Sequence, residues 1–224
     1  MGNVSPAIGR RGALTCCERV VPTNAARYFK TPAPILKHRR VTALLAAHAN
    51  GRVIELGAGC LRNALYLQRR EFRTTVLEIR GIENRFPEAY AAFRRMSGKI
   101  VYAFPHRRRF EIALATFVIE TICDPSLRHS ILAAVAGVLV DEGALILSAR
   151  GPADLVTARA KGVRCSDGYL TPNCSFARSY TKRQLVHLLV TAGFSEFDFL
   201  HKKGTRAPEL LHVIARTRRQ GSAQ

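Results

Sequence analysis

The amino-acid sequence predicts an α/β fold: a doubly wound, mostly parallel seven-stranded sheet with helices on both faces and a C-terminal antiparallel hairpin. Short β-branched runs alternate with helical patterns between residues 52 and 148, which is typical of βαβ units and a parallel sheet. The first of these runs ends in a glycine pair, as a strand does when it enters a tight turn before a helix. Two β-like runs without a helix between them end the chain and predict the hairpin.

The N-terminal region precedes the alternating pattern. Residues 1–24 mix Gly, Pro, Ser and Arg without a period, so we expect a flexible tail. Residues 25–50 are expected to form a helical extension or lid, because apolar residues recur at helical spacing after Pro32 and Pro34, where proline is tolerated. The low acid content of this region also resembles an organelle transit peptide, but the helical pattern favours the extension.

Strands and helices then follow one another along the central region. Each strand is short and rich in apolar or β-branched residues, and each helix has apolar residues three or four positions apart. The strands are expected at residues 52–57, 74–79, 99–103, 110–117 and 144–148, and the helices at 61–70, 83–96 and 126–140.

The last third of the chain departs from this alternation. Residues 151–180 form a link longer than an ordinary loop, which predicts a substrate lid or binding segment. Thr181 caps a helix that Gly193 ends. Residues 194–200 and 210–215 predict the hairpin at the sheet edge, so that one domain covers residues 51–217 and a short tail, 218–224, follows.

Composition excludes several classes of protein. The chain has 224 residues, of which 47% are hydrophobic and 23% charged, as in an ordinary globular domain. The longest strongly apolar run, residues 131–140, is about half of what a membrane span requires. Charged residues interrupt the N-terminus, which argues against a signal peptide. We therefore expect a cytoplasmic protein with no membrane partner.

The net charge of +19 leaves two interpretations open. Such an excess attracts phosphate backbones and other anions, so nucleic acid is a candidate partner. The basic residues are scattered rather than gathered into one stripe, however, and a compositional bias of the genome explains them equally well. Charge alone identifies no partner.

The six cysteines form no CxxC pair and no regular framework. A structural zinc site would need two closely spaced pairs. We therefore expect free thiols and no metal.

The sharpest signal is the run Val53-Ile-Glu-Leu-Gly-Ala-Gly-Cys60. A glycine pair between strand and helix lets the backbone approach a ligand at the carboxyl end of the strand. Glu78 ends the next strand, where a carboxylate can accept both hydroxyls of a ribose. A dinucleotide fingerprint would have a third glycine near Asn63 and Ala64, so these residues favour a different nucleoside cofactor.

Glu55-Leu-Gly-Ala-Gly59 resembles the first motif of the class I, Rossmann-like, S-adenosylmethionine-dependent methyltransferases, which is an acid, one residue and Gly-x-Gly. The segments 110–120, 139–147 and 181–194 resemble the family's fourth strand, its entry to strand five and its late helix. The resemblance covers residues 35–216. It implies an enzyme that transfers a methyl group from S-adenosylmethionine to an oxygen or nitrogen of a small-molecule or peptide acceptor.

The resemblance also implies which residues bind the cofactor. The expected set is Tyr28, Glu55, Gly57, Ala58, Gly59, Glu78, Ile79, Tyr102, Ala103, Phe104, Thr116 and Phe117. Two positions depart from the family. Tyr102-Ala-Phe-Pro105 stands where a carboxylate usually meets the adenine amino group, so aromatic packing takes its place, and Leu61 replaces a third glycine.

Three alternatives stay open for this set. Glu55 is also explained as a buried acid that is hydrogen-bonded within the protein, and Glu78 as the partner of Arg80. Tyr102 and Phe104 are also explained as core residues.

The sequence contains fewer signals for the site that binds the methyl acceptor. Methyl transfer needs a nucleophile placed in line and desolvated, with an optional general base. The catalytic candidates are Glu120, Tyr169 and Tyr180, and the substrate-binding candidates are Arg150, Asp167, Phe176 and Arg178. Histidine in general titrates near neutral pH, so His106 and His129 are further candidates, ranked below Glu120.

Two other functions remain as alternatives. The basic chain suits an RNA methyltransferase, although no Asp-Pro-Pro-Tyr-like tetrapeptide follows the fourth strand and no Pro-Cys nucleophile is present. The departures from the family pattern would also suit a non-catalytic protein that binds the cofactor or nucleic acid through a degenerate site.

Overall fold

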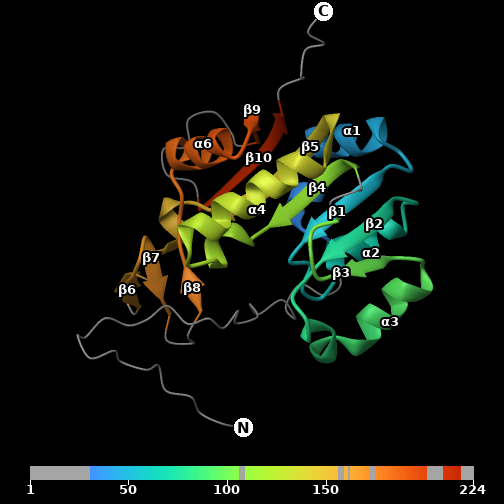
Figure 1. Cartoon of the computed structure of the whole chain (residues 1–224), viewed down its shortest axis with the longest axis horizontal. Coiled ribbons are helices and arrows are strands. Elements are labelled where there is room, and N and C mark those ends of the chain that lie inside the picture. The colour runs from blue at the N-terminus through green and yellow to red at the C-terminus, as the bar shows by residue number, and fades with distance from the viewer. Residues whose placement is uncertain are drawn as a thin grey trace, which may run out of the picture.

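The computed structural model describes residues 31–105, 109–155, 159–160, 162–171, 175–200 and 209–217. A seven-stranded sheet in the order β3-β2-β1-β4-β5-β10-β9 organises them (Figure 1). The first five of these run parallel, and β10 is antiparallel to both β5 and β9. The predicted sheet and its C-terminal hairpin are therefore confirmed. The strands are β1 (Arg52–Leu56), β2 (Arg73–Leu77), β3 (Lys99–Val101), β4 (Phe110–Thr116), β5 (Leu139–Arg150), β9 (Phe194–Phe199) and β10 (Leu210–Thr217).

Helices cover both faces of the sheet. On the near face in Figure 1, α4 (Pro125–Val138) and α6 (Lys182–Thr191) pack against Ile54 and Leu147. The other face is covered by the 3₁₀ helix η2 (Pro34–Lys37) and α1 (Arg39–Ala47), which pack against Val53 and Ile146. Next to them, α2 (Arg62–Gln68) and α3 (Pro87–Arg95) pack around Val76.

The central strands are apolar on both faces because helices lie on both sides. Val53 and Ile54 are adjacent in β1, fully buried, and belong to opposite cores. Polar side chains interrupt this pattern toward the carboxyl ends of the strands, at Glu55, Thr116 and Ser148. These three polar side chains therefore lie toward the same end of the sheet.

Several boundaries differ from those that the sequence predicts. The helical extension expected over 25–50 is divided in its described part, because His38 is extended and its side chain caps α1 by accepting from the Arg40 N–H. The helix expected over 83–96 begins as the 3₁₀ helix η3 (Ile82–Arg85), and α3 starts at Pro87, which fits a first helical turn. The helix α4 ends at Val138, so β5 starts five residues earlier than residue 144, and Leu139 pairs with Phe110.

The long link after β5 contains structure that the sequence pattern does not predict. Three short strands, β6 (Val163–Cys165), β7 (Gly168–Leu170) and β8 (Phe176–Ala177), form a second, antiparallel sheet. Within it Cys165 is disulfide-bonded, so the expectation of free thiols is wrong for this residue. Cys123 is a free thiol, as expected.

Some expectations fall outside the described residues. The tails at 1–24 and 218–224 lie there, as does the N-terminal part of the extension at 25–50. No helix in the described parts of the chain is long and apolar enough to cross a membrane.

Candidate functional site

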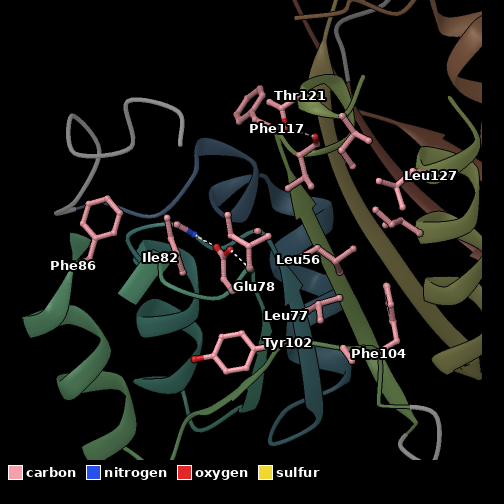
Figure 2. Close-up of a pocket in the computed structure, with 17 residues that line it drawn as sticks. Leu56, Leu77, Glu78, Ile82, Phe86, Tyr102, Phe104, Phe117, Thr121 and Leu127 are labelled. Atoms are coloured by element: carbon pink, nitrogen blue, oxygen red, sulfur yellow. Dashed lines mark hydrogen bonds between the residues drawn. The ribbon is translucent and has the colours of Figure 1, made fainter. Parts of the chain in front are cut away.

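A pocket of about 370 Å³ opens at the carboxyl ends of β1 to β4 (Figure 2). Its walls are mostly apolar, and Glu78 is the only charged side chain among the described residues that line it. The lining residues are Leu56, Gly57, Gly59, Leu77, Glu78, Ile79, Ile82, Phe86, Tyr102, Ala103, Phe104, Phe117, Val118, Thr121, Ile122, Leu127 and Ile131. This is the end of a parallel sheet at which ligands of open α/β folds bind.

The glycine turn after β1 forms one wall of the pocket. Gly57 and Gly59 have φ angles of 58° and 54°, in the left-handed region that favours glycine. The Gly57 N–H donates to the Leu77 carbonyl over 2.9 Å, which fixes the turn against β2. A Cβ atom at position 57 would lie 2.9 Å from Val118 Cγ2. A larger residue would therefore displace Val118, which also lines the pocket.

Glu78 lies in the middle of the pocket, just after β2 (Figure 2). Its Oε1 accepts from the Gly59 N–H at 2.6 Å and its Oε2 from the Ile79 N–H at 3.0 Å. Burial raises the pKa of this carboxyl, and the two backbone donors oppose the rise. Arg80 lies over the Tyr102 ring, 4.8 Å from its centroid, instead of pairing with Glu78. The carboxylate thus belongs to the pocket rather than to an Arg80 ion pair.

Glu55 lies behind the glycine turn and does not line the pocket. Its side chain is 1% exposed, and Asn63 Nδ2 donates to its Oε1 at 2.9 Å. Its Oε2 has no hydrogen-bond partner among the described residues. Burial, reinforced by the nearby Glu78 charge, raises the pKa of Glu55 to about 7. One oxygen therefore matches the buried-acid alternative, while the other still requires a donor.

The remaining walls are aromatic and aliphatic. The Tyr102 hydroxyl donates to Glu83 Oε1 at 2.8 Å, which holds the ring at the rim of the pocket. Phe104 packs against the α4 core and also faces the pocket. Phe117 follows β4 in a left-handed conformation, with φ 59°, and its N–H donates to the Ser148 carbonyl. A non-glycine residue in this conformation stores strain, which is common at binding sites.

The pocket collects most, but not all, of the expected cofactor residues. Those that line it are Gly57, Gly59, Glu78, Ile79, Tyr102, Ala103, Phe104 and Phe117. Ala58 is buried in the core around α2, and Thr116 accepts from Asn63 Nδ2, so neither lines the pocket. Tyr28 lies outside the described residues.

Four of the acceptor-side candidates, Asp167, Phe176, Arg178 and Tyr180, form a separate cluster around Arg128, which was not among the predicted site residues. Arg128 is 1% exposed and donates to Asp167 Oδ2 at 2.5 Å and to the Tyr180 hydroxyl at 3.3 Å. Arg178 also pairs with Asp167, and its guanidinium lies 4.6 Å from the Tyr180 ring centroid. Phe176 is buried beside Arg128. The Arg128 cluster thus fastens the small sheet to α4.

Glu120 lies between this cluster and the pocket, in the 3₁₀ helix η4 (Ile119–Thr121). Its side chain is fully buried, and neither carboxylate oxygen has a hydrogen-bond partner among the described residues. Burial raises its pKa to about 8, while Arg150 opposes and Asp154 adds to the rise. Thr121 and Ile122 line the pocket, whereas Glu120 does not.

The other acceptor-side candidates also lie outside the pocket lining. Arg150 pairs with Asp154 at 2.8 Å, and its carbonyl accepts from the Tyr180 N–H. Tyr169 is half-buried in β7. His129 contacts the Thr191 carbonyl on the outside of α4, and His106 lies outside the described residues.

Sequence reasoning missed the apolar half of the pocket. Ile82 lies in η3, Phe86 between η3 and α3, and Leu127 and Ile131 in α4. Nothing in their spacing distinguishes these four from core residues. Val118 and Thr121 could have been predicted as pocket residues, because they lie in the loop that follows the fourth strand. Within the described part of the chain, no group of three or more His, Cys, Asp or Glu residues is placed to hold a metal ion.

No protein-family model and no curated protein matches the sequence. Solved structures do match. The methyltransferase CcbJ of Streptomyces caelestis is 16% identical, with a TM-score of 0.64, covering 88% of this chain and 97% of that one. The 1,6-didemethyltoxoflavin-N1-methyltransferase of Burkholderia thailandensis, with bound 1,6-didemethyltoxoflavin and S-adenosylhomocysteine, is 20% identical, with a TM-score of 0.58 over 80% and 77% of the two chains.

A third match is the glycopeptide N-methyltransferase MtfA, complexed with S-adenosylhomocysteine. It is 20% identical, with a TM-score of 0.57, and 80% of this chain covers 87% of it. At such identities these similarities establish the fold. The chain has the fold of the class I S-adenosylmethionine-dependent methyltransferases, with its pocket at the carboxyl end of the sheet.

Proposed function

We propose that this protein is an S-adenosylmethionine-dependent methyltransferase. The observation that carries the proposal is the pocket at the carboxyl ends of β1 and β2, where the Gly57–Gly59 turn faces Glu78. Glycine geometry supplies close backbone approach, and one carboxylate supplies acceptors for vicinal hydroxyls. An apolar wall next to them suits a purine ring.

The residues present fit this cofactor. The glycine turn would hold its amino-acid portion, Glu78 its ribose, and the walls at Tyr102 and Phe104 its base. The Oε2 of Glu55 supports this assignment, because a buried carboxylate oxygen without a donor is costly unless a ligand or water supplies one. The cofactor, when bound, supplies an electrophilic methyl group. The chain itself orients the two reactants and excludes water.

We further propose that the acceptor is a small molecule or a peptide that is methylated on oxygen or nitrogen. The similar structures include enzymes whose names specify N-methylation of a toxoflavin precursor and of a glycopeptide. Residues 151–180 are the candidate acceptor segment, because they leave β5 at the pocket end of the sheet. In this proposal Tyr169 or Tyr180 shapes the acceptor site, Arg150 or Arg178 holds an anionic group, and Glu120 acts as base.

RNA is the second candidate acceptor, and the net charge of +19 is the observation that favours it. Retention on RNA that falls steeply with salt would distinguish it from a small-molecule enzyme.

Two measurements test the proposal. Titration calorimetry with S-adenosylhomocysteine is expected to show binding to one site. Labelled S-adenosylmethionine, incubated with a cell extract and then separated into small molecules, protein and RNA, is expected to label the small-molecule or protein fraction. Absence of binding would overturn the cofactor assignment, and label confined to RNA would replace the proposed acceptor class.

A further inference from the structure

Asn63, in the first turn of α2, joins three segments that are far apart in the sequence. Its side chain is 2% exposed and makes three hydrogen bonds. Its Oδ1 accepts from the Ala33 N–H at 2.7 Å, in the segment that leads into η2. Its Nδ2 donates to Glu55 Oε1 at 2.9 Å and to Thr116 Oγ1 at 3.1 Å.

These partners fix the orientation of the amide. A backbone N–H can only donate, and the Glu55 carboxylate accepts when it is ionised, so the oxygen must face Ala33 and the nitrogen must face Glu55. The Asn63 amide is therefore satisfied on both sides in one arrangement. If Ala33 moves away, the buried Asn63 Oδ1 loses its donor. The Asn63 amide is then no longer held in the orientation in which its Nδ2 donates to Glu55.

We propose that Asn63 is a positioning residue that couples the seating of the N-terminal segment at Ala33 to the orientation of Glu55 behind the cofactor pocket. This inference rests on the proposed function, because it assigns Glu55 a ligand. Ala33 and Asn63 line no part of the pocket. Their effect on the cofactor passes through Glu55, whose second oxygen is without a partner in the described structure.

The charged and titratable neighbours of Glu55 determine how a change at Asn63 is read out. Burial and the Glu78 charge raise the pKa of Glu55, whereas the hydrogen bond from Asn63, the Arg62 charge and the Ala64 N–H lower it. Burial raises the pKa of Cys60 and of Tyr90, and the Glu55 charge adds to the rise in both. Removing the Asn63 amide therefore raises the pKa of Glu55 further and delays its ionisation to higher pH.

The first test is the affinity for S-adenosylhomocysteine from pH 6 to 9 in the wild type and in Asn63→Ala. In the wild type, affinity is expected to rise as pH passes through about 7, where Glu55 ionises. In the variant this rise is expected at higher pH, with about tenfold weaker binding at neutral pH. Asn63→Asp keeps the acceptor for Ala33 and places a carboxyl beside Glu55, so it retains the N-terminal contact while its affinity falls as pH rises.

The second test removes the other end of the coupling. Ala33 has φ −57° and ψ 140°, which proline adopts without strain, so Ala33→Pro deletes the N–H donor in a compatible backbone. Ala33→Gly is the matched control, since it keeps that donor. Binding of S-adenosylhomocysteine is expected to weaken at least threefold in Ala33→Pro and to remain near wild type in Ala33→Gly.

The outcomes separate this inference from the function on which it rests. A wild type that does not bind S-adenosylhomocysteine overturns the proposed function. A wild type that binds, with Asn63→Asp and Ala33→Pro matching it in affinity and pH profile, overturns the coupling alone. Equal weakening in Ala33→Pro and Ala33→Gly also overturns it, because the N–H would then be irrelevant.

Discussion

Two regions that both include residues of α4 differ in how their polar groups are paired: the proposed cofactor pocket, which Leu127 and Ile131 line, and the Arg128 cluster beside the small sheet. The pocket is open and apolar, and backbone N–H groups donate to its one carboxylate. The Arg128 cluster is closed, and its charged side chains pair with one another across α4, β6–β7 and the end of β8. The pocket leaves apolar space for a ligand, whereas most charged groups of the Arg128 cluster are paired within the protein; the exception there is the buried Arg178 Nε, which has no hydrogen-bond partner among the described residues.

This contrast limits what the acceptor-side candidates are free to do. Asp167 forms ion pairs with both Arg128 and Arg178, and Tyr180 is 1% exposed. A substrate would have to compete with these contacts, which makes Tyr169, half-buried in β7, the more accessible candidate. Glu120 is the exception in this region, because its buried oxygens have no described partner.

The largest effect is expected from Gly57→Val. The new side chain needs φ 58°, which β-branched residues avoid, and its Cβ would lie 2.9 Å from Val118 Cγ2. Binding of S-adenosylhomocysteine should be lost in calorimetry. Gly193→Val is the control, since Gly193 has φ 99° but its Cβ would meet only Ala136 Cβ at 3.7 Å, far from the pocket lining. Retained affinity in Gly57→Val would place the cofactor elsewhere.

A substitution in the Arg128 cluster should lower the stability of the fold rather than the affinity for S-adenosylhomocysteine. Arg128→Met removes a buried cation from an Asp167 that is a third exposed and keeps Arg178 as partner, so we expect a loss of about 1.5–3 kcal/mol of unfolding free energy. Denaturant unfolding measures this loss, and the affinity for S-adenosylhomocysteine should stay within about twofold, or about 0.4 kcal/mol. A variant that keeps its stability but no longer binds S-adenosylhomocysteine would show that Arg128 acts on the pocket rather than on the fold.

Glu78→Ala should again act on binding rather than on the fold. Two ribose hydroxyls donating to a carboxylate contribute about 1.5–3 kcal/mol each, so affinity should fall at least about tenfold. The melting temperature of the free protein should change little, because both released donors, the Gly59 and Ile79 N–H groups, belong to residues that line the pocket, where water can replace the carboxylate. A large loss of stability with unchanged affinity would make Glu78 a structural residue.

The two regions also differ in how far the sequence predicts them. The glycine turn and Glu78 are local: a strand, a turn that needs positive φ, and an acid at the end of the next strand all leave a pattern within about 30 residues. The Arg128 contacts to Asp167 and Tyr180 span 39 and 52 residues, and no spacing rule connects them. The sequence marks Asn63 only as the absence of a third glycine. Its role could not be predicted, because its partners, the Ala33 N–H, Glu55 and Thr116, come from three separate segments.

Glu120→Gln tests, by its pH dependence, the buried acid next to the Arg128 cluster, whose oxygens have no hydrogen-bond partner among the described residues. The folded protein holds the Glu120 proton up to a pKa of about 8, above the ordinary 4.5, so it binds more protons than the unfolded chain between these values. Wild-type stability therefore falls as pH rises from about 4.5 to 8. The isosteric amide does not titrate, so the variant should gain stability relative to wild type as pH rises.

Melting temperatures at pH 5.5 and 8.5 provide the comparison, with the slope that Glu55 contributes below pH 7 remaining in both proteins. Parallel curves would show that Glu120 is already ionised in the fold. If Glu120 is also the base for methyl transfer, turnover should fall in the variant while cofactor affinity is unchanged.

The smallest effect on the cofactor is expected from Tyr169→Ala. Tyr169 is half-buried in β7, pairs across the small sheet with Arg164 and Ala177, and does not line the pocket. Affinity for S-adenosylhomocysteine should therefore change by less than about twofold, near 0.4 kcal/mol. Turnover with the labelled acceptor fraction should fall, because the proposed acceptor site loses an aromatic wall. Full turnover in this variant would remove residues 151–180 from the acceptor site and leave the small sheet a structural role, fastened by Arg128.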